Sequence, residues 1–301
     1  MTSSDPDRIV VDHARSPFND IWVFEREGFR DMWFRSRGQF FLQSRIETAR
    51  PETLVLVYTR LFMASLLFFP QPSRILIVGL GAGVLPRFLQ EMYPHAGIDV
   101  VEMDPLVRDM ACKHFGFREG GPLRVHLQDG REFLSRPGRR YDLILLDAFK
   151  GGSVPYHLKT CEFYRQIDRS LSPEGVLATN LYGKSNTLKP RDRATLGSVF
   201  KQFYVFEAPR HTATLGVATR QTRPWSEEEI REQVTRLPEN LRRSLSWSEI
   251  IDMIINEKET VSPGTAFTDD FAPDELGRAV RKNNRDDAFR RNPYPIYPAS
   301  G

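Results

Sequence analysis

The sequence predicts an α/β fold in which a parallel β-sheet, covered by helices on both faces, is preceded by a small N-terminal antiparallel β-meander. Three observations predict it. Residues 74–219 alternate short apolar segments with helical stretches, a glycine-rich turn follows the first of these segments, and residues 21–46 alternate apolar with charged side chains. Near-continuous apolar strands separated by helices are typical of buried parallel sheets, whereas period-two alternation is typical of strands with one face in solvent.

The first predicted element is the meander. Its alternation over residues 21–46 is interrupted at Glu27-Gly28 and at Arg37-Gly38, where we expect tight turns between the strands. A helix is then expected over residues 53–69, because Pro70 directly after it cannot continue a helix.

The sheet and its helices follow in alternation. Strands are expected at residues 75–79, 98–102, 124–127, 143–147, 176–181, 203–207 and 214–219. Helices are expected at residues 84–92, 105–114, 131–135, 160–171, 191–202, 226–236 and 246–257. The basic stretch 278–301, rich in Arg, Asn and Pro, is expected to lie on the surface or to be partly disordered.

Composition limits the classes of function. About 40% of the residues are hydrophobic and 27% are charged, as in a globular enzyme, and a net charge of +3 does not call for a nucleic-acid partner. Cys112 and Cys161 are too few for a disulfide framework, and no Cys/His spacing predicts a zinc site. The apolar run 54–69 is shorter than the roughly 20 residues of a membrane helix and contains Arg60. We therefore expect a cytoplasmic protein without a metal or a membrane partner.

A glycine-rich turn carries the first functional signal. Gly79, Gly81 and Gly83 follow an apolar strand and precede a helix. Glycines at such a turn let the backbone bend sharply and approach a ligand, and the helix behind them offers free amides. A tight turn with no ligand is the alternative interpretation.

An acidic residue at the end of the second strand complements that turn. Glu102, followed by Met103, can accept both hydroxyls of a ribose. The dinucleotide fingerprint needs a third glycine at position 84, where this chain has Val84, so a pyrophosphate site is not expected. Ribose and adenine without phosphate indicate an S-adenosyl ligand.

Two aspartates follow the next strands. Asp129, in front of Gly130, can accept a hydrogen bond from an adenine amino group or cap the following helix. Asp147 closes an apolar strand at the edge where ligands of open α/β sheets bind. A carboxylate there suits a general base or the binding of an amine, and a plain polar strand end is the alternative.

Together these residues resemble the polyamine aminopropyltransferases, the spermidine synthase family, over about residues 21–219. The match includes the meander, Gln43 after it, the glycine turn, V-E-M-D at 101–104, D-G-R at 129–131 and the strand ending in Asp147. The resemblance implies a Rossmann-like sheet of the S-adenosylmethionine-dependent methyltransferase type. It divides the chain into the meander (1–50), a catalytic domain (51–260) and a C-terminal loop with a basic tail (261–301).

The resemblance also implies roles and a reaction. Gln43 and Glu102 would bind the nucleoside, Asp129-Gly130 the adenine, and Tyr58 the substrate, while Asp147 would orient and deprotonate the attacking amine. The reaction is transfer of an aminopropyl group from decarboxylated S-adenosylmethionine to a small amine, releasing methylthioadenosine without a metal, in a homodimer. Methyl transfer from intact S-adenosylmethionine, and a non-catalytic nucleoside-binding homologue, are the alternatives.

The chain departs from the family pattern at three positions. Ala82 stands where the family has an Asp, Arg60 replaces a Glu, and Lys150 replaces the second Asp of a D-x-x-D loop. The missing carboxylates would hold cations, so we expect a polycation to bind poorly unless other acids compensate.

The segment T-D-D-x-x-P at 268–273 is the candidate compensator. Asp269 or Asp270 could fold back over the carboxyl edge of the sheet and supply negative charge for the substrate. The alternative is an Asx-Pro turn that caps a helix at 274–281.

Overall fold

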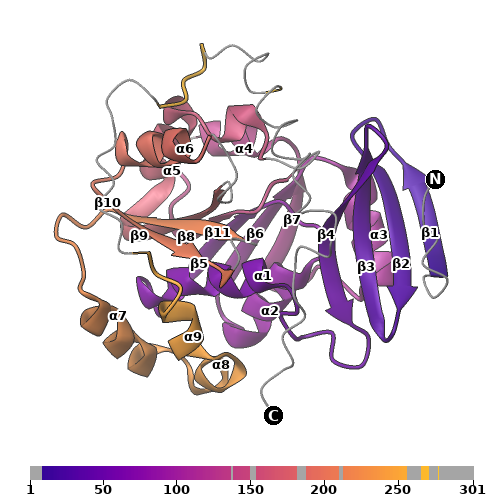
Figure 1. The fold of residues 1–301 in the computed structure, drawn as a ribbon, viewed down its shortest axis with the longest axis horizontal. Coiled ribbons are helices and arrows are strands. Elements are labelled where there is room, and N and C mark those ends of the chain that lie inside the picture. Colours follow the sequence, from indigo (N-terminus) through magenta and orange to yellow (C-terminus); the bar gives the residue numbers. More distant parts are fainter. Residues whose placement is uncertain are drawn as a thin grey trace.

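The computed structural model describes residues 9–136, 138–149, 154–181, 188–209, 213–255, 266–270 and 277. Two β-sheets and the helices around the larger one make up the described chain (Figure 1). The predicted α/β class, with an antiparallel N-terminal sheet ahead of a mostly parallel one, is confirmed. The division at residues 50 and 260 stays a prediction.

The N-terminal sheet has the order β1-β2-β3-β4 and is antiparallel throughout. Its strands are β1 (Ile9–Arg15), β2 (Asp20–Arg26), β3 (Phe29–Ser36) and β4 (Gln39–Glu47). Both expected turns are present, and all four of their residues have positive φ, the conformation that two-residue hairpins need. The prediction missed β1, because this edge strand is largely exposed and lacks regular alternation of apolar and polar residues.

The larger sheet has the order β10-β11-β9-β8-β5-β6-β7. Its strands are β5 (Arg74–Val78), β6 (Gly97–Glu102), β7 (Leu123–Leu127), β8 (Tyr141–Leu146), β9 (Leu171–Leu181), β10 (Gln202–Glu207) and β11 (Thr214–Thr219). The five strands from β9 to β7 are parallel, whereas β11 runs antiparallel to both of its neighbours. The short connection from β10 to β11 permits a hairpin and no crossover.

Helices cover both faces of this sheet (Figure 1). One face carries α4 (Gly130–Ser135), the short η2 (Tyr156–Leu158), α5 (Cys161–Ser170) and α6 (Lys189–Gly197). The other carries α1 (Val57–Phe62), η1 (Met63–Leu67), α2 (Val84–Met92), α3 (Pro105–His114), α7 (Glu227–Gln233), η4 (Val234–Arg236), α8 (Glu239–Ser244) and α9 (Trp247–Ile251).

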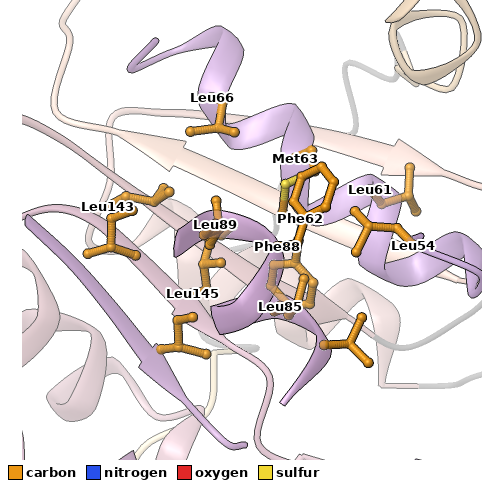
Figure 2. Close-up of a cluster of buried hydrophobic side chains, with 14 of the residues drawn as sticks. Leu54, Leu61, Phe62, Met63, Leu66, Leu85, Phe88, Leu89, Leu143 and Leu145 are labelled. Carbon is orange, nitrogen blue, oxygen red and sulfur yellow. The ribbon is translucent and has the colours of Figure 1, made fainter. Parts of the chain in front are cut away.

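The apolar run expected as one helix is instead the short helix α1 followed by the 3-10 helix η1. The hydroxyls of Thr59 and Ser65 each donate a 2.6 Å hydrogen bond to a carbonyl three residues earlier, which competes with regular helix geometry. Figure 2 shows that the side chains of this run pack with those of α2 against Leu143 and Leu145 of β8. Among the described residues, no helix is long and apolar enough to cross a membrane.

The C-terminal third differs from the prediction in two further ways. The helix α8 was not predicted, and the helix expected at 246–257 ends at α9, after which Ile254 bridges to Phe206 of β10. The stretches 274–281 and 278–301 lie outside the described residues, apart from residue 277, and so does Lys150.

Candidate active site

The carboxyl ends of β5 and β8 meet where the strand order reverses, because the chain runs from β5 towards β7 on one side and from β8 towards β9 on the other. Ligands of open α/β sheets bind at such a switch point. Gly79 and Asp147 follow these two strands, and Asp147 N–H donates to the carbonyl of Val78 at 2.8 Å. A Cβ on Gly79 would lie 2.7 Å from the Asp147 carbonyl oxygen, so only glycine allows the two turns to come this close.

The glycine turn also contacts the N-terminal sheet. Ala82 N–H donates a 3.0 Å hydrogen bond to Ser44 Oγ of β4, and a Cβ on Gly81 would lie 2.6 Å from the same oxygen. Gly83, which begins α2, has a positive φ and packs against the ring of Phe117. The loop is therefore held from both sides.

Glu102 lies at the end of β6 beside this turn. Its Oε2 accepts a hydrogen bond from Leu80 N–H at 3.0 Å, and its Oε1 accepts one from Asp104 N–H at 2.9 Å. Burial raises the pKa of Glu102, and hydrogen bonds from the backbone N–H groups of Asp104, Leu80 and Met103 oppose that rise. A carboxylate can accept about four hydrogen bonds, so these backbone donors do not exhaust it, and it can still accept from a ribose hydroxyl.

Two large apolar side chains are exposed next to Glu102. Met103 is 37% exposed, and Leu127, which pairs with Glu102 across β6 and β7, is 40% exposed. Exposed apolar side chains beside polar groups are typical of small-molecule sites. Their placement fits one face of a flat, apolar ring such as adenine.

Asp129 lies at the end of the next strand and caps α4. Its Oδ1 accepts hydrogen bonds from the N–H groups of Arg131 (2.8 Å) and Glu132 (3.1 Å), and its Oδ2 lies 2.8 Å from His157 Nε2. Burial opposes ionisation, but the hydrogen bonds from His157 and the two amides outweigh it and lower the pKa of Asp129. Gly130 packs on β5, where a Cβ would lie 2.5 Å from Val78. The capping and nucleoside interpretations of Asp129 are compatible.

Asp147 is paired with a residue that the sequence analysis did not select. Asn180 Nδ2, on the neighbouring strand β9, donates a 2.9 Å hydrogen bond to Asp147 Oδ1. Burial raises the pKa of Asp147 to about 8, although the hydrogen bond from Asn180 opposes the rise. A carboxyl with a pKa this close to neutrality is suited to accept a proton.

Gln43 and Tyr58 lie together at the meander side of the site. Gln43 is the extra residue of a β-bulge, because Met32 pairs with Ser44 while the adjacent Trp33 pairs with Leu42. Bulges re-aim side chains and are common next to active sites. The Tyr58 hydroxyl donates to the Gln43 carbonyl at 2.9 Å and so holds the bulge from α1.

The C-terminal segment 266–270 docks against α4, η2, α5 and α6. Arg131 donates from Nη1 and Nη2 to the two carboxylate oxygens of Asp269, at 2.8 and 2.6 Å, and Asp269 N–H donates to Glu162. Phe267 is fully buried, and its N–H and carbonyl bond to Thr195 and to Cys161 N–H. The charge of Asp269 is therefore matched by Arg131, while Asp270 is exposed.

Comparison with known proteins places this arrangement in a family. A model of the spermine/spermidine synthase domain matches residues 56–215. The chain is 33% identical over 272 residues to a polyamine aminopropyltransferase of Vibrio vulnificus, an alignment that covers 89% of this chain and 91% of that protein. This chain belongs to the spermine/spermidine synthase family.

Other relatives of this spermidine synthase family member extend the comparison. The eEF1A lysine and N-terminal methyltransferase of Bos taurus is 34% identical over 150 residues, which are 46% of this chain and 22% of that protein. A spermidine synthase solved in complex with the transition-state analogue AdoDATO has the same fold, with a TM-score of 0.65 and 18% identity over 81% of this chain and 84% of the other.

In this member of the spermidine synthase family, position 82 offers no charge to the site. Ala82 is fully buried, and its N–H is bound to Ser44. Arg60 lies half-buried on α1. Among the described residues, no three His, Cys, Asp or Glu side chains are grouped so as to hold a metal ion.

Proposed function

We propose that this chain transfers the aminopropyl group of decarboxylated S-adenosylmethionine to a small amine and releases methylthioadenosine. The observation that carries the proposal is Asp147, a half-buried carboxyl whose pKa is raised to about 8, at the switch point of the sheet. Similarity to a polyamine aminopropyltransferase over most of the chain supports the same reaction class.

The donor would lie along the carboxyl ends of β5, β6 and β7. Glu102 would accept the ribose hydroxyls, Asp129 with Gly130 would receive the adenine amino group, and Met103 would cover a face of the ring. The glycine turn at Gly79, Gly81 and Gly83, together with Gln43 in its bulge, would enclose the nucleoside. The position of Glu102 beside the glycine turn and the exposure of Met103 support this placement.

The chemistry is one displacement. The lone pair of the neutral amine forms a bond to the carbon next to the sulfonium, the carbon–sulfur bond breaks, and its electron pair leaves with sulfur as uncharged methylthioadenosine. The nitrogen that forms the new bond loses one proton. Because the sulfonium is already an activated leaving group, the chain has to orient the amine and take up a proton.

The raised pKa of Asp147 suits that step. A primary amine with a pKa near 10.4 would lose its proton to a carboxylate of ordinary pKa at a cost of about 9 kcal/mol. With the pKa of Asp147 at about 8, that cost falls to about 3 kcal/mol. Asn180 would hold one carboxylate oxygen and leave the other for the amine.

The product of the reaction tests the proposal. The purified chain is incubated with decarboxylated or intact S-adenosylmethionine and a panel of mono-, di- and triamines, and the nucleoside products are separated by mass. We expect methylthioadenosine, formed only from the decarboxylated donor and only with an amine. S-adenosylhomocysteine as the sole product would establish methyl transfer instead, and nucleoside binding without turnover would establish a non-catalytic homologue.

We also propose a homodimer with its interface at β1. This strand ends the N-terminal sheet, and its Ile9, Val10 and Val11 are 67%, 52% and 37% exposed. An apolar edge strand pairs readily with another strand, and a second copy of β1 would extend the sheet symmetrically. Light scattering of the wild type and of Val10→Lys tests it: we expect a dimer that Val10→Lys dissociates, and a monomeric wild type would contradict the proposal.

A further inference from the structure

The turn between β1 and β2 reaches the buried side chain of Asp104. Ser16 Oγ donates to Asp104 Oδ2 at 2.6 Å, and Asn19 Nδ2 donates to the same oxygen at 2.7 Å. Asp104 is 0% exposed, and its Oδ1 caps α3 by accepting Leu106 N–H at 3.0 Å. Both oxygens of this carboxylate are therefore held, one of them by the meander alone.

Asp104 in turn holds Glu102. The Asp104 N–H donates to Glu102 Oε1 at 2.9 Å, while Leu80 N–H from the glycine turn donates to Oε2. The orientation of the Glu102 carboxylate depends on these two amides as well as on the Met103 N–H. One of them is set by the glycine turn, and the other belongs to a residue whose side chain is held by Ser16 and Asn19.

We propose that Ser16 and Asn19 are positioning residues for the ribose-binding carboxylate of Glu102, acting through Asp104. The inference rests on the proposed function, because it requires a ribose at Glu102. The N-terminal sheet would then contribute to donor binding a second time. This contribution acts on Glu102 Oε1, whereas the glycine turn holds Oε2. The effect should be confined to the ribose hydroxyls, since neither side chain reaches another proposed donor contact.

A second contact between the same elements provides a matched control. Asp12, on β1 itself, accepts hydrogen bonds from Lys113 at 2.7 Å and from His114 at 2.6 Å at the far end of α3. Asp12 and Asn19 thus both join the N-terminal sheet to α3. Of these two residues, only Asn19 contacts Asp104, whose N–H donates to Glu102.

The experiment compares Asn19→Ala with Asp12→Ala in the full chain. Asn19→Ala removes only a donor to Asp104, because the backbone hydrogen bond from Ser16 N–H to the Asn19 carbonyl remains. Titration calorimetry measures the Kd of methylthioadenosine and of its 2′,3′-dideoxy analogue, and thermal unfolding is recorded for each variant. Asn19→Ser serves as a second variant if Asn19→Ala does not fold.

We expect Asn19→Ala to raise the Kd of methylthioadenosine about tenfold, the effect of one hydrogen bond to a charged group, and to change that of the dideoxy analogue less than about twofold. Asp12→Ala should change neither Kd, even where it lowers the unfolding temperature. Equal weakening of both nucleosides by Asn19→Ala, no weakening, or the same weakening by Asp12→Ala would overturn the inference. A wild type that binds neither nucleoside would instead overturn the proposed function.

Discussion

Asn180 Nδ2 donates a 2.9 Å hydrogen bond to Asp147 Oδ1 across the carboxyl ends of the parallel strands β9 and β8. The bond orients the carboxyl group and opposes the rise in its pKa that burial causes. Asp147 therefore has one oxygen fixed by the sheet and the other available to an amine. This pairing gives the proposed base both a direction and a pKa that suits its role.

Removal of Asn180 should move the pH dependence of the reaction. Its hydrogen bond lowers the pKa of Asp147, so Asn180→Ala should raise that pKa by roughly half a unit to one unit. The rise of activity with pH should then occur at a higher pH in the variant than in the wild type. Thr219→Val, on the neighbouring strand β11, is the control and should leave the pH–rate profile in place. An unshifted profile for Asn180→Ala would show that Asn180 does not act on the base.

Asp147→Asn should stabilise the fold at alkaline pH while abolishing turnover. The folded-state pKa of about 8 lies above the ordinary value of 3.8, so between these values the folded chain binds a proton that the unfolded chain has lost. Wild-type stability must fall as pH rises through this window, by at most about 1.4 kcal/mol per pH unit. An amide has no such proton to lose. Melting curves at pH 5, 6.5 and 8 should show an advantage of the variant that grows with pH, and a constant difference would argue against the raised pKa.

Substitution of Gly79 should damage the site more than substitution of a glycine with similar backbone geometry elsewhere. A Cβ on Gly79, at φ +103, would meet the Asp147 backbone at 2.7 Å, whereas one on Gly28, at φ +78, would meet nothing within 4 Å. Gly28→Ala should therefore cost about 1 kcal/mol of backbone strain and keep full activity. Gly79→Ala should also lose nucleoside binding in calorimetry. Full binding by Gly79→Ala would show that the two turns separate without consequence.

The strand ends were predictable from the sequence because each functional residue there directly follows an apolar segment, as Glu102 and Asp147 do. The role of Asn180 was not predictable, because its contact with Asp147 depends on β9 lying next to β8 and no local sequence pattern marks Asn180. The contact from Ser16 to Asp104 joins residues 88 positions apart, which periodicity cannot reveal. The edge strand β1 was missed for a different reason, since it has no buried face to impose alternation.

The two acids proposed to bind the acceptor should behave differently when neutralised. Asp269 is paired with Arg131 in a partly exposed ion pair, so Asp269→Asn should lower the unfolding free energy by no more than about 1 kcal/mol. Asp270→Asn should raise the acceptor KM while the unfolding temperature stays the same. Steady-state kinetics of both variants and of the double variant separate these effects. An unchanged acceptor KM in the double variant would remove both acids from the acceptor site.

The pH dependence of methylthioadenosine release tests the central role of Asp147 most directly. With decarboxylated S-adenosylmethionine and an amine that the wild type accepts as a substrate, kcat/KM for the wild type should increase with pH, with a midpoint near the Asp147 pKa of about 8. The Asp147→Asn variant should bind methylthioadenosine with the wild-type Kd and release none from the donor at any pH. Substantial turnover by that variant, or a wild-type profile that is flat from pH 6 to 9, would contradict Asp147 as the proton acceptor.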